Sequence, residues 1–340
     1  MKKTKKTESR KIKAAIIGMG IGEKHFEAIN NYKGSKVLLI CEKDKKKILE
    51  LRKRYPKIKI TNDENNIFLD KKINLVSIAS FDNHHFSQIV KCFKAKKHII
   101  VEKPMCLNKN ELKKIISLVK KNKNVKIISN LVLRVNSLFK DIKKKIINKD
   151  IYYIEADYIW GRAEKLLQWR AKIKNYSITL GAGIHMIDLV MWMLKSKPIY
   201  VQAFGNNLAT RGTAFSKKSF AIYIFQFPNN VLVKVTSNAG SIYEHFHELK
   251  IFEKKKSLIH SYLGTYSFKK KNKETVFNRI NNNYPDKKNR KKLIQSFIDS
   301  LLDKKNNEII NLKDQIDLMT VCFASDKALE LGKKIKIRYK

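Results

Sequence analysis

The chain has 340 residues, of which 43% are hydrophobic, and it contains 12 Gly and 5 Pro. This length and composition predict a globular protein of about two domains and exclude a low-complexity or disordered chain. No apolar run reaches the length of about 20 residues that a membrane-spanning helix needs, so we expect no membrane partner.

The net charge of +43 raises the question of a nucleic-acid partner. The basic excess is mostly Lys, whereas Arg is preferred for bidentate contacts to bases and phosphates. The lysines are also spread over the whole chain and form no single stripe. We therefore interpret the charge mainly as solvated surface and expect no specific nucleic-acid partner, although we expect nonspecific binding to nucleic acid at low salt.

Four cysteines occur without CxxC spacing, at Cys41, Cys92, Cys106 and Cys322. This pattern is typical of reduced thiols rather than of a zinc site or a disulfide framework. The basic residues 1–13 are not followed by the apolar run of a secretory signal. We therefore expect a cytoplasmic protein that begins with a basic tail at residues 1–10.

Strands and helices alternate through residues 11–134. The expected strands are 11–17, 36–41, 58–61, 75–79, 99–101 and 125–130, and the expected helices are 23–32, 45–55, 65–70, 85–96 and 108–121. Such alternation predicts a parallel sheet with right-handed crossovers. We therefore expect an α/β Rossmann domain at residues 11–134.

The first strand leads into a glycine turn, Gly18-Met19-Gly20-Ile21-Gly22, which a helix follows. Backbone N–H groups of such a turn, together with the helix N-terminus, bind a pyrophosphate. The spacing is GxGxG, with Glu23 where the standard motif has its last glycine, so a simple tight turn remains an alternative.

The second strand ends in an acidic residue, Glu42. An acid about 20 residues after the glycines is expected to accept a hydrogen bond from the ribose 2′-hydroxyl of NAD. Lys43 and the lysines after Asp44 would instead suit the 2′-phosphate of NADP. We expect NAD as the cofactor, and NADP stays an alternative.

The buried strand Ile99-Ile100-Val101 ends in Glu102-Lys103-Pro104. Pro104 cannot continue the sheet ladder, it favours an extended Lys103, and it allows a cis peptide bond. A lysine at the carboxyl end of a central parallel strand faces the crevice in which open α/β sheets bind ligands.

The pattern changes after Arg134. The expected strands are 151–158, 199–205, 219–227, 231–237, 247–252 and 258–262, and the expected helices are 137–148, 181–194, 288–302 and 313–331. Turn signals such as Pro228-Asn229-Asn230 indicate hairpins of an antiparallel sheet. We expect an α+β domain at residues 135–340, whose C-terminal helix can pack back on the Rossmann domain.

The chain thus presents, in order, a glycine turn with His25 behind it, the loop 80–85, Glu102-Lys103-Pro104, and Gly183-x-His185-x-x-Asp188. These motifs resemble the glucose–fructose oxidoreductase / inositol dehydrogenase / MocA (Gfo/Idh/MocA) family over about Lys11 to Leu331. The resemblance implies a Rossmann domain followed by a domain with a large, mostly antiparallel sheet that builds an oligomer. It also implies hydride transfer between a nicotinamide cofactor and a CH–OH carbon of a sugar, inositol or nucleotide sugar.

The resemblance further implies roles for single residues. Lys103 matches the catalytic lysine of the family, and His185 matches the histidine of its D-x-G-x-H motif. Gly181 stands where that motif has its aspartate, so we expect a Lys–His pair and leave open which of the two is the acid/base. The expected cofactor contacts are Gly18, Met19, Gly20, Ile21, Gly22, Glu42, Lys43, Ser80, His85, Glu102, Trp169 and Arg170.

Aromatic and arginine side chains precede the His185 helix. Arg162 or Arg170 would clamp a phosphate or carboxylate, and Trp169 would stack on a sugar or on nicotinamide. Strand-end packing and solvated charge are alternatives of equal weight. The expected substrate contacts are Tyr158, Arg162 and Asp188, with Arg134 weaker. The loose spacing of His245, His247 and His260 predicts no metal site.

The sequence therefore predicts an NAD(P)-dependent dehydrogenase of a sugar or cyclitol, and the resemblance implies assembly as a homodimer or homotetramer through the C-terminal sheet, so that residues 135–340 form a substrate and oligomerisation domain. Oxidation of a secondary alcohol needs a base for the hydroxyl proton while nicotinamide takes the hydride. Histidine titrates near neutrality, and a partly desolvated lysine serves as well. A binding or regulatory protein that holds NAD without turnover is the alternative, which the missing aspartate favours, and a nucleic-acid-binding protein comes third.

Overall fold

The computed structural model describes residues 11–281, 284–302 and 308–339, so the expected tail at residues 1–10 lies outside the described residues. The chain forms two compact units. Of the described residues, unit 1 contains 11–106, 113–130, 288–302 and 308–312, and unit 2 contains 107–112, 131–281, 284–287 and 313–339. The chain passes into unit 2 after Asn130, close to the border expected after Arg134, and it returns to unit 1 at Lys288–Leu312.

Unit 1 is built on a six-stranded sheet of order β3-β2-β1-β4-β5-β6, in which every neighbouring pair is parallel. The strands are β1 (Ile12–Ile17), β2 (Ser35–Cys41), β3 (Lys59–Thr61), β4 (Leu75–Ile78), β5 (His98–Val101) and β6 (Ile127–Ser129). Every residue of β4 is buried, because helices cover both faces of such a sheet. The strand order reverses between β1 and β4, and ligands bind at the carboxyl ends of the strands at such a point.

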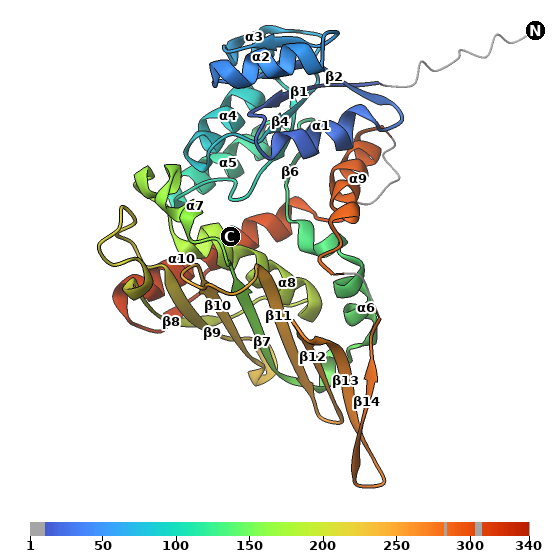
Figure 1. Cartoon of the computed structure of the whole chain (residues 1–340), viewed down its shortest axis with the longest axis vertical. Helices are drawn as coiled ribbons and strands as arrows, with labels where there is room; N and C mark the ends of the chain where they lie inside the picture. Colours follow the sequence, from blue (N-terminus) through green and yellow to red (C-terminus); the bar gives the residue numbers. More distant parts are fainter. Residues whose placement is uncertain (1–10, 282–283, 303–307, 340) are drawn as a thin grey trace, which may run out of the picture. The chain divides into compact units, whose positions relative to one another are not determined.

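The helices of unit 1 surround this sheet (Figure 1). They are α1 (Gly22–Asn30), α2 (Lys45–Arg54), α3 (Asn65–Leu69), α4 (Asp82–Lys94), α5 (Lys109–Lys121), whose first residues fall in unit 2, and α9 (Lys291–Leu302), which lies beside α1. Helix α4 begins at Asp82, earlier than the expected start at His85. Asp82 in the first turn complements the helix dipole, and the extended Phe81 precedes it, so His85 lies inside the helix.

Unit 2 is built on a nine-stranded sheet of order β14-β13-β12-β11-β7-β10-β9-β8-β15. Its strands are β7 (Ile151–Ile159), β8 (Tyr200–Asn206), β9 (Phe220–Gln226), β10 (Leu232–Asn238), β11 (Phe246–Glu253), β12 (Lys256–Ser261), β13 (Gly264–Lys271), β14 (Glu274–Arg279) and β15 (Ile335–Lys336). The β7–β10 pair is parallel and the other pairs are antiparallel, so the expected mostly antiparallel sheet is confirmed.

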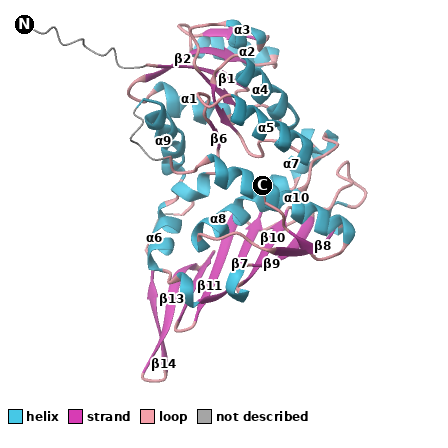
Figure 2. Cartoon of the chain, turned by 180° about the vertical axis from the view of Figure 1, so that it is seen from behind, coloured by secondary structure: helices cyan, strands magenta, loops and turns pink. Residues whose placement is uncertain are grey.

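The hairpin β13–β14 extends from the rest of this sheet (Figures 1 and 2) and was not expected from the sequence. Its residues are mostly exposed, β13 ends in three consecutive lysines, and β14 has no sustained alternation of apolar and polar residues, so the signal of a strand is weak. Two-residue β15 is too short to leave any pattern.

The helices of unit 2 are α6 (Ser137–Lys145), α7 (Glu164–Leu167), α8 (Ile184–Leu194) and α10 (Leu312–Leu331), which begins at the border with unit 1. A π-helical turn, Thr179–Gly183, leads into α8, so helical backbone begins before the expected start at Gly181. Helix α8 lies against the sheet, in contact with β7, and all its residues but Trp192 are buried. No helix among the described residues is long and apolar enough to cross a membrane.

A buried ion pair fixes α8 within unit 2. The guanidinium of Arg134 donates to both carboxylate oxygens of Asp188 at 2.7–3.1 Å, and its other arm donates to Asp314 at 2.7 Å. Burial disfavours the guanidinium charge, but Asp188 and then Asp314 outweigh it, so the pKa of Arg134 is raised. Asp188 is only 1% exposed, and this geometry favours a structural role over the expected contact with substrate.

Loss of this ion pair is expected to destabilise the protein strongly. Asp188→Ala would leave a buried guanidinium without its main partner and should lower the free energy of unfolding by about 3–5 kcal/mol. Asp314→Ala is the matched control, because the Asp314 side chain is 42% exposed and such a pair contributes about 1 kcal/mol or less. Urea denaturation measures both, and equal losses in the two variants would contradict this account.

Candidate active site

Steric limits shape the glycine turn of unit 1. Gly18 has φ +83°, and a Cβ there would lie 2.7 Å from the carbonyl oxygen of Ala79. A Cβ on Gly22 would lie 3.1 Å from Ile16 Cγ2, so Gly22 allows α1 to pack closely on β1. Glu23 instead faces solvent, where it pairs with Arg54 at 3.2 Å. The close-packing glycine therefore sits one position earlier than the standard motif predicts, which explains the GxGxG spacing.

The side chain of Glu42 is hydrogen-bonded to the backbone of this turn. One carboxylate oxygen accepts from the backbone N–H of Met19 at 2.8 Å, and the other accepts from the N–H groups of Lys43 at 2.6 Å and Asp44 at 3.1 Å. The acid at the end of β2 thus lies against the glycine turn, as a ribose ligand must. Each carboxylate oxygen has two acceptor sites, so Glu42 keeps capacity for a further donor.

The N-terminus of α1 has the properties of an anion site. Ile21 precedes the helix, and within the described residues no side chain caps it. The first N–H groups of a helix carry partial positive charge and bind phosphate groups. The cradle that Gly18 opens, the uncapped helix and the carboxylate of Glu42 together fit a dinucleotide, with the pyrophosphate at the turn and a ribose at Glu42.

His85 lies in a place that sequence reasoning did not foresee. Its side chain is 0% exposed, and its ring nitrogens contact two backbone carbonyls, Nδ1 that of Pro104 at 2.7 Å and Nε2 that of Ser80 at 3.1 Å. His85 therefore has no exposed surface that could contact a cofactor, so the expected cofactor contact at His85 is not supported. The ring instead ties the segment after β4 to the segment after β5. Ser80 is half-buried and donates its hydroxyl to Gln88 at 2.7 Å.

Lys103 follows β5 at the same carboxyl edge of the sheet as the glycine turn and Ser80. It is half-buried, and its peptide bond to Pro104 is cis. Burial opposes the ionisation of the neighbouring Glu102, but hydrogen bonds from His25 and Asn130 and the charge of Lys103 outweigh it and lower the pKa of Glu102 to about 2. Glu102 is therefore an anion beside Lys103 at any physiological pH. His25 and Asn130 were not among the expected site residues.

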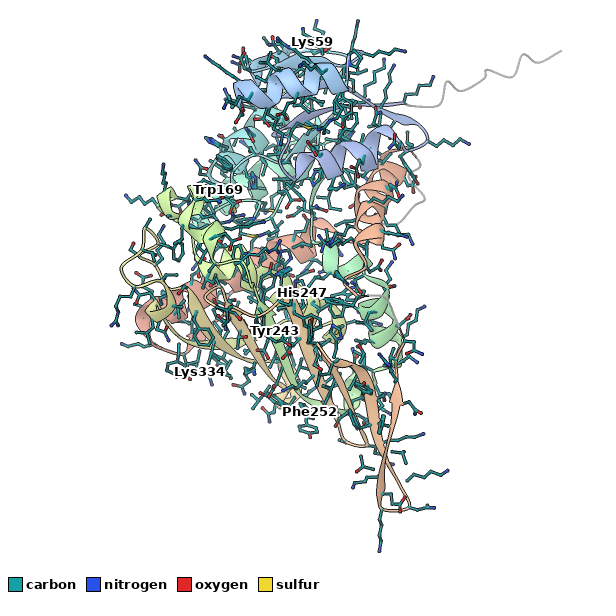
Figure 3. The ribbon with its side chains drawn as sticks, in the orientation of Figure 1. Lys59, Trp169, Tyr243, His247, Phe252 and Lys334 are labelled. Atoms are coloured by element: carbon teal, nitrogen blue, oxygen red, sulfur yellow. The ribbon has the colours of Figure 1, made fainter. Side chains whose placement is uncertain are left out.

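In unit 2, rings of three elements pack around Tyr158. The imidazole of His185 is stacked on Tyr158 at 5.5 Å between centroids and 8° between planes. Tyr158 is the register partner of His247, whose ring lies 4.8 Å from it, and Trp160 meets Tyr158 edge-on at 6.2 Å. His247 lies near the start of β11 and Phe252 near its other end (Figure 3). We call Tyr158, Trp160, His185, His245 and His247 the ring cluster.

The ring cluster contains three imidazoles. The His245 and His247 centroids lie 5.1 Å apart, and those of His185 and His247 lie 6.4 Å apart. His245 Nδ1 donates to the Trp160 carbonyl at 2.9 Å, and His247 Nδ1 is hydrogen-bonded to the Tyr284 hydroxyl. In the described part of the chain, no three His, Cys, Asp or Glu side chains are arranged to hold a metal ion.

A cationic group adjoins the ring cluster. The Arg170 guanidinium lies 4.1 Å from the Trp169 ring centroid and 5.5 Å from that of Trp160. Burial, and then the charges of Arg162 and Arg170, lower the pKa of Lys165. Arg170 also donates to the backbone carbonyl of Lys165 at 3.4 Å. Arg162 Nε is buried with no hydrogen-bond partner among the described residues. The structure thus connects the expected residues Tyr158, Trp169, Arg170 and His185, with Arg162 beside them.

Gly181 precedes His185 by about one helical turn, and Tyr176 leaves no room for a side chain there. A Cβ on Gly181 would lie 1.9 Å from the hydroxyl oxygen of Tyr176 and 2.6 Å from its Cζ. Tyr176 is only 3% exposed and its ring packs edge-on against Phe215. The phenol therefore fills the space that the carboxylate of the resembled motif would need.

The glycine turn offers a matched pair of substitutions. Gly18→Ala should destabilise the protein and weaken NADH binding by about tenfold or more, because the positive φ and the Ala79 carbonyl both oppose a side chain. Gly20→Ala is the control for stability, since a Cβ there meets no protein atom within 4 Å. Urea denaturation compares the two variants and NADH fluorescence titration measures the affinity of Gly18→Ala, and a Gly18→Ala chain as stable as Gly20→Ala and with wild-type NADH affinity would refute the assignment.

A second substitution tests the space at Gly181. Gly181→Asp should lower the free energy of unfolding, and Tyr176→Ala in the same chain should recover about 1–3 kcal/mol relative to the sum of the single changes. Tyr176→Phe is no remedy, because Cζ itself lies 2.6 Å from the added Cβ. Urea denaturation of the two single variants and of the double variant gives the interaction free energy between positions 176 and 181. Additive effects would mean that Tyr176 does not occupy this space.

Both units match models of one family. Residues 12–130 match the model described as "Oxidoreductase family, NAD-binding Rossmann fold", and residues 150–259 match the model described as "GFO/IDH/MocA C-terminal domain". These two stretches contain the glycine turn, Lys103, the ring cluster and His185.

Individual proteins show the same likeness. The chain is 23% identical to myo-inositol 2-dehydrogenase of Thermotoga maritima over 247 residues, which are 72% of this chain and 73% of the relative. It is 26% identical to scyllo-inositol 2-dehydrogenase (NADP(+)) of Bacillus subtilis over 189 residues, 52% of this chain and 50% of the relative. Among solved structures, scyllo-inositol dehydrogenase from Lactobacillus casei with bound NAD(H) and scyllo-inositol matches with TM-score 0.79 and 18% identity, covering 96% of this chain and 99% of that one.

The likeness to this solved structure supports the fold. The first family model matches residues of unit 1 and the second matches residues of unit 2. With its glycine turn, its Glu-Lys-Pro strand end and both halves matched, the chain belongs to the Gfo/Idh/MocA family of oxidoreductases, whose N-terminal domain is an NAD-binding Rossmann fold.

Proposed function

We propose that this protein is an NAD-dependent dehydrogenase that interconverts a CH–OH group and a carbonyl on a cyclitol or a related sugar. The observation that carries this proposal is the carboxyl edge of the unit 1 sheet. The glycine turn, Glu42 and Lys103 follow β1, β2 and β5 there, on both sides of the point where the strand order reverses.

The same edge supports NAD over NADP. A ribose at Glu42 would bring its 2′ position to a carboxylate that already accepts from the turn N–H of Met19. A hydroxyl donates to that carboxylate, whereas a 2′-phosphate would be repelled by it. Lys43 is exposed beside Glu42 and is the feature that favours NADP as the alternative.

Bound NAD supplies the hydride acceptor, and the protein must supply proton transfer and orientation. In the oxidation direction, the hydroxyl proton is taken by one of the two groups that the family motifs identify, Lys103 Nζ or the His185 imidazole. In the reduction direction, the same group returns a proton to the substrate oxygen. Burial in the ring cluster holds the His185 ring in one orientation against Tyr158, as a general base requires.

The residues that adjoin the ring cluster support a ring-shaped polyol as substrate. Trp169 and Arg170 are half-buried, so the indole can pack on the C–H face of a sugar or cyclitol while the guanidinium binds its hydroxyls. The neighbouring cations Arg162, Lys165 and Arg170 favour a phosphate or carboxylate on either the substrate or the cofactor. Asp188 is no longer needed in this scheme, because Arg134 engages both of its oxygens.

Assembly and location belong to the same proposal. A homodimer or homotetramer through the nine-stranded sheet is supported by a face that mixes stacked rings, Tyr153 on Phe252 at 5.8 Å, with charge pairs such as Lys234–Glu155. A cytoplasmic location is supported by the cysteines, all four of which are buried and unpaired in disulfides.

A protein that binds NAD without turnover is the second candidate. The observation that favours it is Gly181, where the Tyr176 phenol occupies the space of a carboxylate. Such a protein would bind NADH and oxidise no polyol, so turnover distinguishes the two candidates.

The deciding experiment is a screen of inositols, sugars, sugar phosphates and nucleotide sugars with NAD and with NADP, followed by absorbance at the nicotinamide band. We expect turnover of a cyclitol or sugar with NAD. Lys103→Met and His185→Ala should then each lower kcat/KM by about 100-fold or more, with NADH affinity changed by about twofold or less. Lys121→Ala, an exposed lysine at the end of α5, is the control and should leave kcat/KM unchanged.

The two candidates predict different results. NADH binding without turnover of any substrate would favour the non-catalytic protein. Near wild-type rates in both Lys103→Met and His185→Ala would overturn the assigned roles even if the dehydrogenase activity is found.

A further inference from the structure

A buried hydrogen-bonded cluster lies beside Lys103 in unit 1. Its four members come from four parts of the fold: His25 from α1, Ser77 from β4, Glu102 from the end of β5, and Asn130 from the end of β6. His25 is 1% exposed, Ser77 is 0% exposed and Asn130 is 9% exposed. We call these four residues the His25 cluster.

The imidazole of His25 bridges two strands. Its Nδ1 is hydrogen-bonded to Ser77 Oγ at 2.7 Å, and its Nε2 lies 2.9 Å from Glu102 Oε1. Asn130 Nδ2 donates to the same Oε1 at 2.7 Å. The second oxygen, Oε2, accepts from the backbone N–H of Lys103 at 3.3 Å. The carboxylate is therefore held on one side by side chains of α1 and β6 and on the other by the backbone of Lys103.

These hydrogen bonds connect the helix that follows the glycine turn to Lys103 through two side chains, those of His25 and Glu102. Helix α1 begins directly after the glycine turn, so its place is tied to the turn. His25, in the first turns of α1, holds Glu102, and Glu102 adjoins Lys103. The Glu102 side chain is only 14% exposed, so without these donors the carboxylate would be more costly to keep ionised and the end of β5 would rearrange.

We propose that His25 is a positioning residue for Lys103, which through Glu102 fixes the end of β5 relative to the helix that follows the glycine turn. The inference rests on the proposed function, in which Lys103 acts on the substrate hydroxyl. It adds the buried His25 to the proposed function. His25 does not touch the substrate and affects it only by positioning Lys103 through Glu102.

The two ends of the imidazole can be tested separately. The amide of Gln reaches about as far as Nε2 of His, and the amide of Asn reaches about as far as Nδ1. His25→Gln therefore keeps a donor for Glu102 and loses the Ser77 contact. His25→Asn keeps the Ser77 contact and leaves Glu102 without that donor. Ser77→Ala removes only the hydroxyl and is a further control.

The experiment uses the full chain and two readouts. Steady-state kinetics with NAD gives kcat and KM, and labelling with an amine-reactive ester, resolved by mass spectrometry, gives the modification rate at Lys103 with Lys121 as internal reference. We expect His25→Asn to lower kcat by about tenfold or more, since small displacements of a reacting group are costly. KM for NAD should stay within about twofold, and the Lys103 labelling rate should change by about threefold or more. His25→Gln and Ser77→Ala should stay near wild type in each.

Each outcome decides the inference. Wild-type kcat and labelling in His25→Asn would overturn it, as would equal losses in His25→Gln and His25→Asn, because the donor to Glu102 would then not matter. If His25→Asn does not fold, Glu102→Gln takes its place and must alter Lys103 labelling in the same way. If the wild-type chain turns over no substrate, the proposed function fails, while the labelling readout still decides whether His25 positions Lys103.

Discussion

The carboxyl edge of the unit 1 sheet depends on the hydrogen bonds that the ionised carboxylate of Glu102 accepts. Parallel strands end together, and each end leaves backbone and side-chain groups that need partners. Glu102 meets this need with two oxygens, one toward His25 and Asn130 and the other toward the Lys103 backbone. His85 adds a second tie by bonding the carbonyls of Ser80 and Pro104. The segments after β4 and β5 are thus held by imidazoles that never reach solvent.

In unit 2, ring packing orients the candidate catalytic residue His185, whereas in unit 1 hydrogen bonds hold the segment that contains Lys103. Tyr158 lies between His185 of α8 and His247 of β11, so the orientation of the His185 ring follows from the pairing of β7 with β11. The buried Arg134–Asp188 pair fixes α8 one turn further on. The departure from the family motif at Gly181 has a steric cause in this chain, because Tyr176 already fills the space.

Burial decides which expected site residues keep a direct role. Glu42 stays half-exposed at the glycine turn and retains acceptor capacity, so its expected contact with a ribose is compatible with the structure. His85 and Asp188 are 0% and 1% exposed, and both are engaged by protein partners. A motif identifies a position in the chain, but it does not say whether the side chain there faces a ligand or the core.

The sequence by itself determined the alternation of strands and helices in unit 1, the glycine turn, the lysine after β5 and the family, because periodicity, turn residues and motif order are local properties. It did not predict the β13–β14 hairpin, since both strands are mostly exposed and carry little apolar alternation. Only the tertiary structure placed His25 and Asn130 on Glu102 and the Tyr176 hydroxyl against Gly181. His25 and Glu102 are 77 residues apart, and contacts at such separation depend on how strands are ordered in the sheet, which no local pattern records.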